Sequence, residues 1–226
     1  MSDIRGTVND VTLQAGSEGN PMSLNATKRG EQVVVDFYTA MALRGRGYQI
    51  KAGTIATGVA MDSVITDAAA EGCVDAAAGT TIIPVNFSID FANIATATTI
   101  KVRIKAVGAV SSAGTAFVPL PLLQGGSAAT STARVANNGG VTVTAEAATT
   151  TRALFHYQDV ATQTPTTDTP GGGGGVGAAI ASAAWAPRLP YVGKGAACVY
   201  VQAAATTAFP LYFFTLDYIE IPTANL

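Results

Sequence analysis

The stretch that decides the fold is TTIIPVNFSIDFANI, residues 80–94. Apolar and polar residues alternate along it, and successive side chains of a strand point to opposite faces of a sheet. The apolar set on one face is Ile83, Val85, Phe87, Ile89 and Phe91. The polar set on the other is Asn86, Ser88 and Asp90. The pattern predicts a half-buried strand, and Pro84 predicts that this strand lies at a sheet edge or contains a bulge.

The next segment, TTIKVRIKAVGAV at 98–110, alternates even more cleanly. Its apolar face carries Ile100, Val102 and Ile104, and its other face carries Lys101, Arg103 and Lys105. Because the period is two and the residues are β-branched, the segment predicts a second strand with a basic outer face.

Further β-rich runs occupy 116–123, 140–147, 152–160, 196–204 and 209–221, with Gly- and Asn-rich turns between them. Residues 31–43 and 48–59 flank the turn RGRG and predict a hairpin, with a helix across 31–43 as the alternative. No alternation of strands with helices is present. The chain is therefore expected to be all-β, an antiparallel two-sheet sandwich or a barrel of eight or nine strands.

Two regions depart from this pattern. Residues 1–30 are polar and glycine-containing without a clear period, and they predict an extended N-terminal arm. Residues 61–78 contain alanines and acids, and they predict a short helix or a loop excursion. We expect residues 31–226 to form a single domain, because all-β domains of about this length are common.

The charged fraction is low. Of the 226 residues only 12% are charged, while 48% are hydrophobic, and about a quarter charged is typical. Since a soluble monomer usually keeps more charge on its surface, we expect other copies of the chain to cover much of it. The net charge of −2 creates no strong field toward nucleic acid or membrane. The first residues lack the apolar core of a signal peptide, and no membrane span is expected.

The glycine tract at 171–175 suggests a phosphate-binding loop, and Gly172, Gly174 and Gly177 satisfy G-x-G-x-x-G. That motif requires a hydrophobic strand before the loop and an acid about twenty residues after it. A Pro/Thr-rich linker precedes the tract, and no acid follows Asp168 until Asp217. We therefore interpret 162–177 as a long surface loop and expect no nucleotide cofactor.

Catalytic and metal-binding sets are also not predicted. His156 is the only histidine, no G-x-S-x-G motif is present, and we interpret it as structural. The acids Asp62, Asp67, Glu71 and Asp75 lack the spacing of a calcium loop and are interpreted as a solvated face. Cys73 and Cys198 are the only cysteines. They could form a single bridge, but two buried free thiols are favoured. We expect no enzyme, no cofactor and no metal.

The basic residues Lys101, Arg103 and Lys105 are the sharpest polar feature. Three cations on one strand face could neutralise phosphates without sequence preference. The alternative, a solvated face with ion pairs to neighbouring residues, is favoured. If the chain forms a shell, the same face could contact a packaged genome.

The arm, the strand layout, the long small-residue loops and the low charge together resemble single-jelly-roll virion structural proteins, particularly phage capsid proteins. The resemblance implies an eight-stranded jelly roll whose copies assemble into a capsid in the virion, with themselves and other virion proteins as partners. A phage tail, fibre or decoration protein is the first alternative. An extracellular β-sandwich adhesin or carbohydrate-binding module is the second.

Overall fold

The computed structural model describes residues 37–63, 65–66, 68–92, 98–136, 140–143, 154–161, 181–184, 192, 194–203 and 210–225. Within these ranges the chain is mostly β-structure, with one short α-helix, α1 (Phe37–Leu43), and a final 3₁₀ turn, η1 (Thr223–Asn225). All the strand ladders described are antiparallel. The all-β expectation is confirmed at this level.

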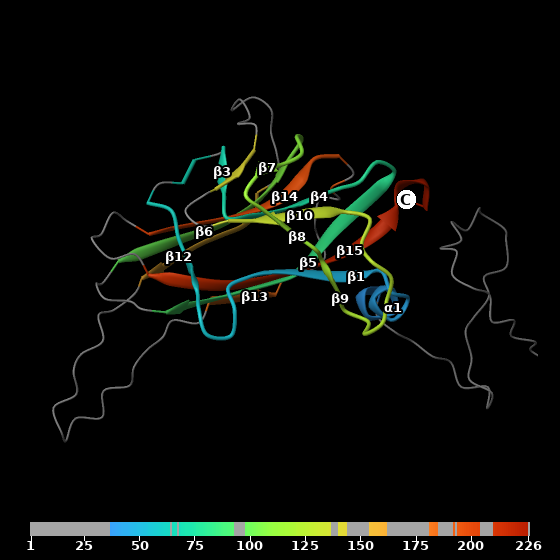
Figure 1. Cartoon of the computed structure of the whole chain (residues 1–226), viewed down its shortest axis with the longest axis horizontal. Coiled ribbons are helices and arrows are strands. Elements are labelled where there is room, and N and C mark those ends of the chain that lie inside the picture. The colour runs from blue at the N-terminus through green and yellow to red at the C-terminus, as the bar shows by residue number, and fades with distance from the viewer. Residues whose placement is uncertain are drawn as a thin grey trace, which may run out of the picture.

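The strands form two large sheets and one small one (Figure 1). The first sheet has the order β13 (Ala181–Ala184), β5 (Thr80–Ala92), β15 (Leu211–Pro222), β1 (Gly47–Ala52) and β9 (Leu120–Pro121), and β2 (Val59–Ala60) also pairs with β15. The second has the order β12 (Leu154–Ala161), β6 (Thr99–Val107), β14 (Ala196–Ala203), β4 (Gly72–Asp75), β10 (Thr132–Val135) and β8 (Thr115–Phe117). The third consists of β3 (Ala69–Ala70), β11 (Val141–Thr142) and β7 (Ser112–Ala113).

The main core takes its side chains from both large sheets. Phe87 and Leu216 come from the first sheet, and Ile104 and Val199 come from the second. The alternation expected for residues 98–110 is confirmed, because Ile100, Val102 and Ile104 of β6 are fully buried while its basic residues lie on the opposite face.

Each large sheet is also covered on part of its outer face. The third sheet packs on the second, where Val141 joins a cluster with Cys198 and Tyr200. Helix α1 packs on the first sheet, where Met41 joins a cluster with Ile219. Figure 1 shows α1 and β3 on opposite sides of the molecule. Strand β14 is consequently buried on both faces over most of its length, and β15 is so from Tyr218 to Ile221.

Two local predictions are corrected by the structure. Residues 37–43 form the helix given as the alternative to a hairpin strand, because Tyr38 and Met41, three positions apart, meet the same apolar surface of the first sheet. The region 61–78 contains the strands β3 and β4 instead of a helix. Ala70 is buried between the second and third sheets, and Gly72 leaves room for the ring of Phe214.

Pro84 marks a bulge and not an edge. Strand β5 lies inside the first sheet between β13 and β15. Asp217 is opposite Asn86, but the next residue, Tyr218, is opposite Pro84, so that Val85 is an extra residue. A bulge accommodates the missing proline N–H within a sheet.

The connection from β6 to β12 supplies added strands to all three sheets. Strand β9 extends the first sheet beside β1, β10 and β8 extend the second beside β4, and β7 and β11 belong to the third. The run 116–123, expected as one strand, divides into β8 and β9 in different sheets. The short strand β13 was not predicted. The arm 1–30 and the loop with the glycine tract lie outside the described residues.

Candidate functional site

The basic strand β6 presents fewer available charges than its sequence suggests. Lys101 is exposed and Lys105 is half-buried. The Arg103 side chain is 12% exposed and lies 2.6 Å from the carboxylate of Asp159. Its guanidinium also donates to the backbone oxygen of Gln158 at 2.7 Å. The favoured interpretation, a strand face with ion pairs, is confirmed for Arg103, while nucleic-acid contact stays a prediction.

His156 lies in β12, where its backbone is opposite Ile104 of β6. The strand predicted for this region is confirmed, although it begins and ends one or two residues later than expected. Asp159, the nearest acid in sequence, is engaged by Arg103. These contacts assign Asp159 a structural role in joining β12 to β6.

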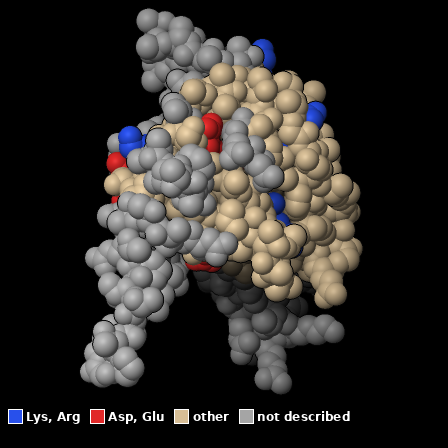
Figure 2. Space-filling view, turned by 60° about the vertical axis from the view of Figure 1, so that its left-hand side comes forward, with Lys and Arg blue, Asp and Glu red and all other residues tan. Residues whose placement is uncertain are grey.

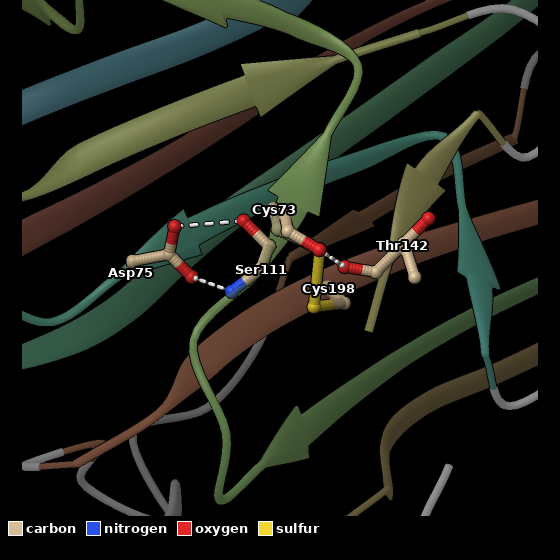
Figure 3. The surroundings of a disulfide bond; sticks show 6 residues. Cys73, Asp75, Ser111, Thr142 and Cys198 are labelled. Atoms are coloured by element: carbon tan, nitrogen blue, oxygen red, sulfur yellow. Dashed lines mark hydrogen bonds between the residues drawn. A yellow bond between two sulfur atoms is a disulfide. The ribbon is translucent and has the colours of Figure 1, made fainter. Parts of the chain in front are cut away.

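Two of the acids interpreted as a solvated face are buried. Asp75 is 5% exposed, and its two carboxylate oxygens accept hydrogen bonds from the backbone N–H and the hydroxyl of Ser111, at 2.6 and 2.7 Å. Asp75 thereby fixes the start of the long connection after β6 to strand β4 (Figure 3). Sequence spacing missed this role because the partner lies 36 positions away.

Glu71 is 1% exposed and lies directly before β4. Its Oε2 accepts a hydrogen bond from the backbone N–H of Val201 at 2.8 Å, whereas its Oε1 is buried without a partner. Burial raises the pKa of this carboxyl to about 8, against the opposing effect of the Val201 N–H, and the negative charge of Asp62 raises it further. The group therefore holds its proton at neutral pH.

Glu220 in β15 is equally buried but fully bonded. Its Oε2 accepts from the backbone N–H of Thr130 at 3.0 Å and from the Thr130 hydroxyl at 2.8 Å. Its Oε1 accepts from the N–H of Ser131 at 2.9 Å and from the Ser131 hydroxyl. The Ser131 hydroxyl is also 2.7 Å from that of Tyr218. No sequence pattern identified this carboxylate, which ties the connection after β6 to the first sheet.

Cys73 and Cys198 form a disulfide, so the expectation of free thiols is wrong. They lie directly opposite one another on β4 and β14, with Cα atoms 4.2 Å apart. Both are fully buried, and Thr142 of the third sheet lies beside them (Figure 3). Antiparallel pairing brings such opposed residues close enough to bridge, but a separation of 125 residues gives no sequence signal for it.

An apolar surface occupies one corner of the molecule, and we call it the apolar edge. Its residues are exposed by 38–75%, and they are Leu43, Val118, Leu120, Leu122 and Leu123. The end of α1 and residues 118–123 meet at the turn after α1, because a side chain at Gly47 would lie 3.0 Å from Leu122 and 3.2 Å from Ala42. Arg44 and Arg46 in the same turn are exposed. Figure 2 shows a different face of the molecule, on which few charged side chains are visible among the described residues.

The apolar edge lies on the outermost strand of the first sheet. Leu122 N–H donates to Gly47 O at 2.9 Å, toward β1. Because N–H directions alternate along a strand, the nitrogens of Pro119 and Pro121 face away from β1 and carry no hydrogen. A further strand placed against this edge would therefore find no N–H donors at these two positions. A partner would therefore contact this edge through side chains.

Comparison of the chain with protein-family models, curated proteins and solved structures finds no match. Among the described residues, no three metal-ligating side chains gather into a group that could hold an ion. In the same part of the chain, no helix has the length and apolar character needed to cross a membrane.

Proposed function

We propose that the chain is a virion structural protein that assembles with copies of itself into a capsid shell. The observation that carries this proposal is the apolar edge, five exposed large aliphatic side chains on a chain with only 12% charged residues. Contiguous apolar surface of this kind on a soluble protein is typical of an interaction site. Aliphatic side chains can form a packed contact with a partner, and they carry no groups that act in catalysis.

The strand order supports a two-sheet jelly roll as the fold of this subunit. Eight strands, numbered one to eight along the chain, are β1, β4, β5, β6, β12, β13, β14 and β15. They pair one with eight, two with seven, three with six and four with five. Eight with three and seven with four also pair. This is one long hairpin curled on itself, the arrangement expected of a jelly roll, which occurs in viral capsids and in lectins.

In this proposal, the inner faces of the two sheets hold the subunit together and its edges hold the shell together. Four of the five residues of the apolar edge belong to the loop region 106–133, which we propose as a subunit contact. We propose the arm 1–30 and the loop 162–178 as further contacts. The basic residue Lys101 is the cation of β6 most available to a packaged nucleic acid.

The first test measures the mass and shape of the purified, untagged protein by light scattering and electron microscopy. We expect large closed particles or regular sheets. The double variant Leu120→Ser, Leu122→Ser should yield smaller species with unchanged thermal stability, because both side chains are exposed. The control Ile55→Ser changes an exposed apolar residue outside the proposed contacts and should assemble normally. A trimer or ring would indicate a tail, fibre or decoration protein instead, and a monomer would contradict self-assembly.

The disulfide favours a second candidate, an extracellular adhesin or carbohydrate-binding module of the same fold. Disulfides persist in oxidising surroundings such as the cell exterior, although also on released virions. This candidate predicts a monomer whose thermal unfolding temperature rises with particular glycans. A protein that assembles and shows no shift across a glycan panel would exclude it.

A further inference from the structure

The C-terminal half of β14 lacks a full neighbouring strand on the side away from β6. Strand β4 pairs with β14 only from Ala196 to Val199. Beyond that point, residues 61–63, which we call the strap, take over. Asp62 N–H donates to Val201 O at 3.2 Å, and Ala203 N–H donates to Asp62 O at 3.1 Å. The strap therefore covers a strand edge that would otherwise be open.

Glu71 fills the gap between β4 and the strap. Its backbone N–H donates to Val199 O at 3.0 Å, which continues the ladder of β4. Its side chain then supplies the acceptor for the Val201 N–H at 2.8 Å. A carboxyl group thus takes the place of one backbone carbonyl in the ladder, and it is the one member of that ladder with a titratable proton.

The surroundings of Glu71 do not favour a negative charge. The negative charge of Asp62 in the strap raises the pKa of Glu71. Tyr212 of β15 is also close, because a negative charge on Glu71 raises the pKa of the Tyr212 phenol. The Tyr212 hydroxyl donates to Ala136 O at 3.3 Å. The Val201 N–H donates to the carboxyl at 2.8 Å, the backbone N–H groups of Asp62 and Glu71 oppose the rise of its pKa more weakly, and Oε1 has no hydrogen-bond partner. An ionised Glu71 would leave a buried, unpartnered oxygen beside another acid.

We propose that Glu71 is a proton-dependent latch, which holds the strap on β14 when neutral and releases it when ionised, opening the β14 edge at Val201 and Ala203. The device is independent of capsid assembly, because it concerns contacts within one subunit. It assigns a conformational response to pH to the strap and to the β14 edge that the strap covers.

The direction of the response follows from where the proton binds best. The closed state holds the Glu71 proton up to about pH 8, while an open, solvated carboxyl holds it only to its ordinary value of 4.5. Closure is therefore most favourable below pH 4.5. It weakens as the pH rises toward 8, by up to about tenfold per unit in the opening equilibrium, and changes little beyond that.

Amide hydrogen exchange of the full chain, followed by residue from pH 5 to 8.5, tests the latch. Protection of Val201 and Ala203, corrected for intrinsic exchange, should fall by up to about tenfold per pH unit relative to Tyr200 and Gln202. The amides of this second pair alternate with the first and face β6. In Glu71→Gln the ratio should be independent of pH, because the amide keeps an acceptor and has no proton to lose.

The matched control is Glu220→Gln, the same change in an equally buried glutamate, which should leave the pH response of Val201 intact. Asp62→Asn provides a second variant should Glu71→Gln fold poorly. Removing the like charge should lower the pKa of Glu71 in the closed state. The pH range over which protection falls should therefore be narrower. A ratio that does not change with pH in the wild-type protein, or that falls equally in Glu71→Gln, would overturn the latch.

Discussion

Glu71 and Glu220 are both 1% exposed, yet their surroundings differ completely. Each joins strands that are far apart in the sequence. Glu220 accepts hydrogen bonds from two backbone N–H groups and two hydroxyls of Thr130 and Ser131. Glu71 accepts one from Val201, leaves Oε1 unpartnered, and lies near Asp62.

The difference shows that burial alone does not determine what a carboxyl group does. Four donors around Glu220 replace the hydrogen bonds to water that its side chain loses on burial. One donor around Glu71 does not, so that its pKa rises to about 8. Glu220 and its four donors, which we call the clamp, hold the connection after β6 on the first sheet. Glu71 instead joins β4 to β14 in a way that depends on whether its own carboxyl group is protonated.

The largest expected effect concerns the pH dependence of stability. Folding raises the pKa of Glu71 from 4.5 to about 8, so the folded chain binds a proton that the unfolded chain releases. Stability present at acid pH should decline as the pH rises, by about 4 kcal/mol in total between pH 5 and 8. Denaturant unfolding of wild type and Glu71→Gln across this range measures it. The same dependence of the free energy of unfolding on pH in both proteins would contradict the role given to the Glu71 proton.

Removing the clamp should have the next largest effect. Glu220→Ala leaves the buried N–H of Ser131 and the N–H of Thr130 without acceptors. We expect a loss of about 3 kcal/mol in the free energy of unfolding. Chemical denaturation measures this loss, and a loss below about 1 kcal/mol would show that water replaces the side chain easily.

Asp75 offers an intermediate case, with two donors, both from Ser111. Asp75→Asn keeps an acceptor for the Ser111 N–H but replaces the other acceptor with an NH2 group, so that the Ser111 hydroxyl must turn to accept instead of donating. The expected loss is about 1–2 kcal/mol, readable as a lower midpoint of thermal unfolding. A cost as large as that of Glu220→Ala would mean that the number of donors does not set the scale.

The smallest effect is expected for a single outer contact of the clamp. Thr130→Ala removes the hydroxyl that lies 2.8 Å from Glu220 Oε2 but keeps the backbone N–H donor. Because Thr130 is exposed, water can replace the hydroxyl, and we expect a loss of about 0.5–1 kcal/mol. Denaturant unfolding detects it. A loss near 3 kcal/mol would assign the clamp to this hydroxyl instead.

Sequence reasoning identified the strands best where one face of a sheet is buried. The alternation at 98–110 predicted β6 and the burial of Ile100, Val102 and Ile104. It failed where the element is short. Strand β4 was expected to be part of a helix or a loop because its segment is rich in alanines and acids, and β13 was not predicted.

The candidate sites were less predictable than the fold. The basic residues of β6 were found from their spacing, but the pairing of Arg103 with Asp159 depends on a neighbouring strand 56 positions away. The apolar edge was not singled out. The sequence VPLPLL at 118–123 resembles core, and only its place on an outermost strand makes Leu120 and Leu122 exposed.

By itself the sequence determined that the chain is rich in strands and low in charge, because periodicity and composition can be read within each segment. Tertiary structure alone decided that Cys73 meets Cys198, that Glu220 finds four donors, and that Glu71 finds one. These outcomes depend on which distant strands become neighbours. A burial environment is a property of that arrangement and not of the residue's own segment.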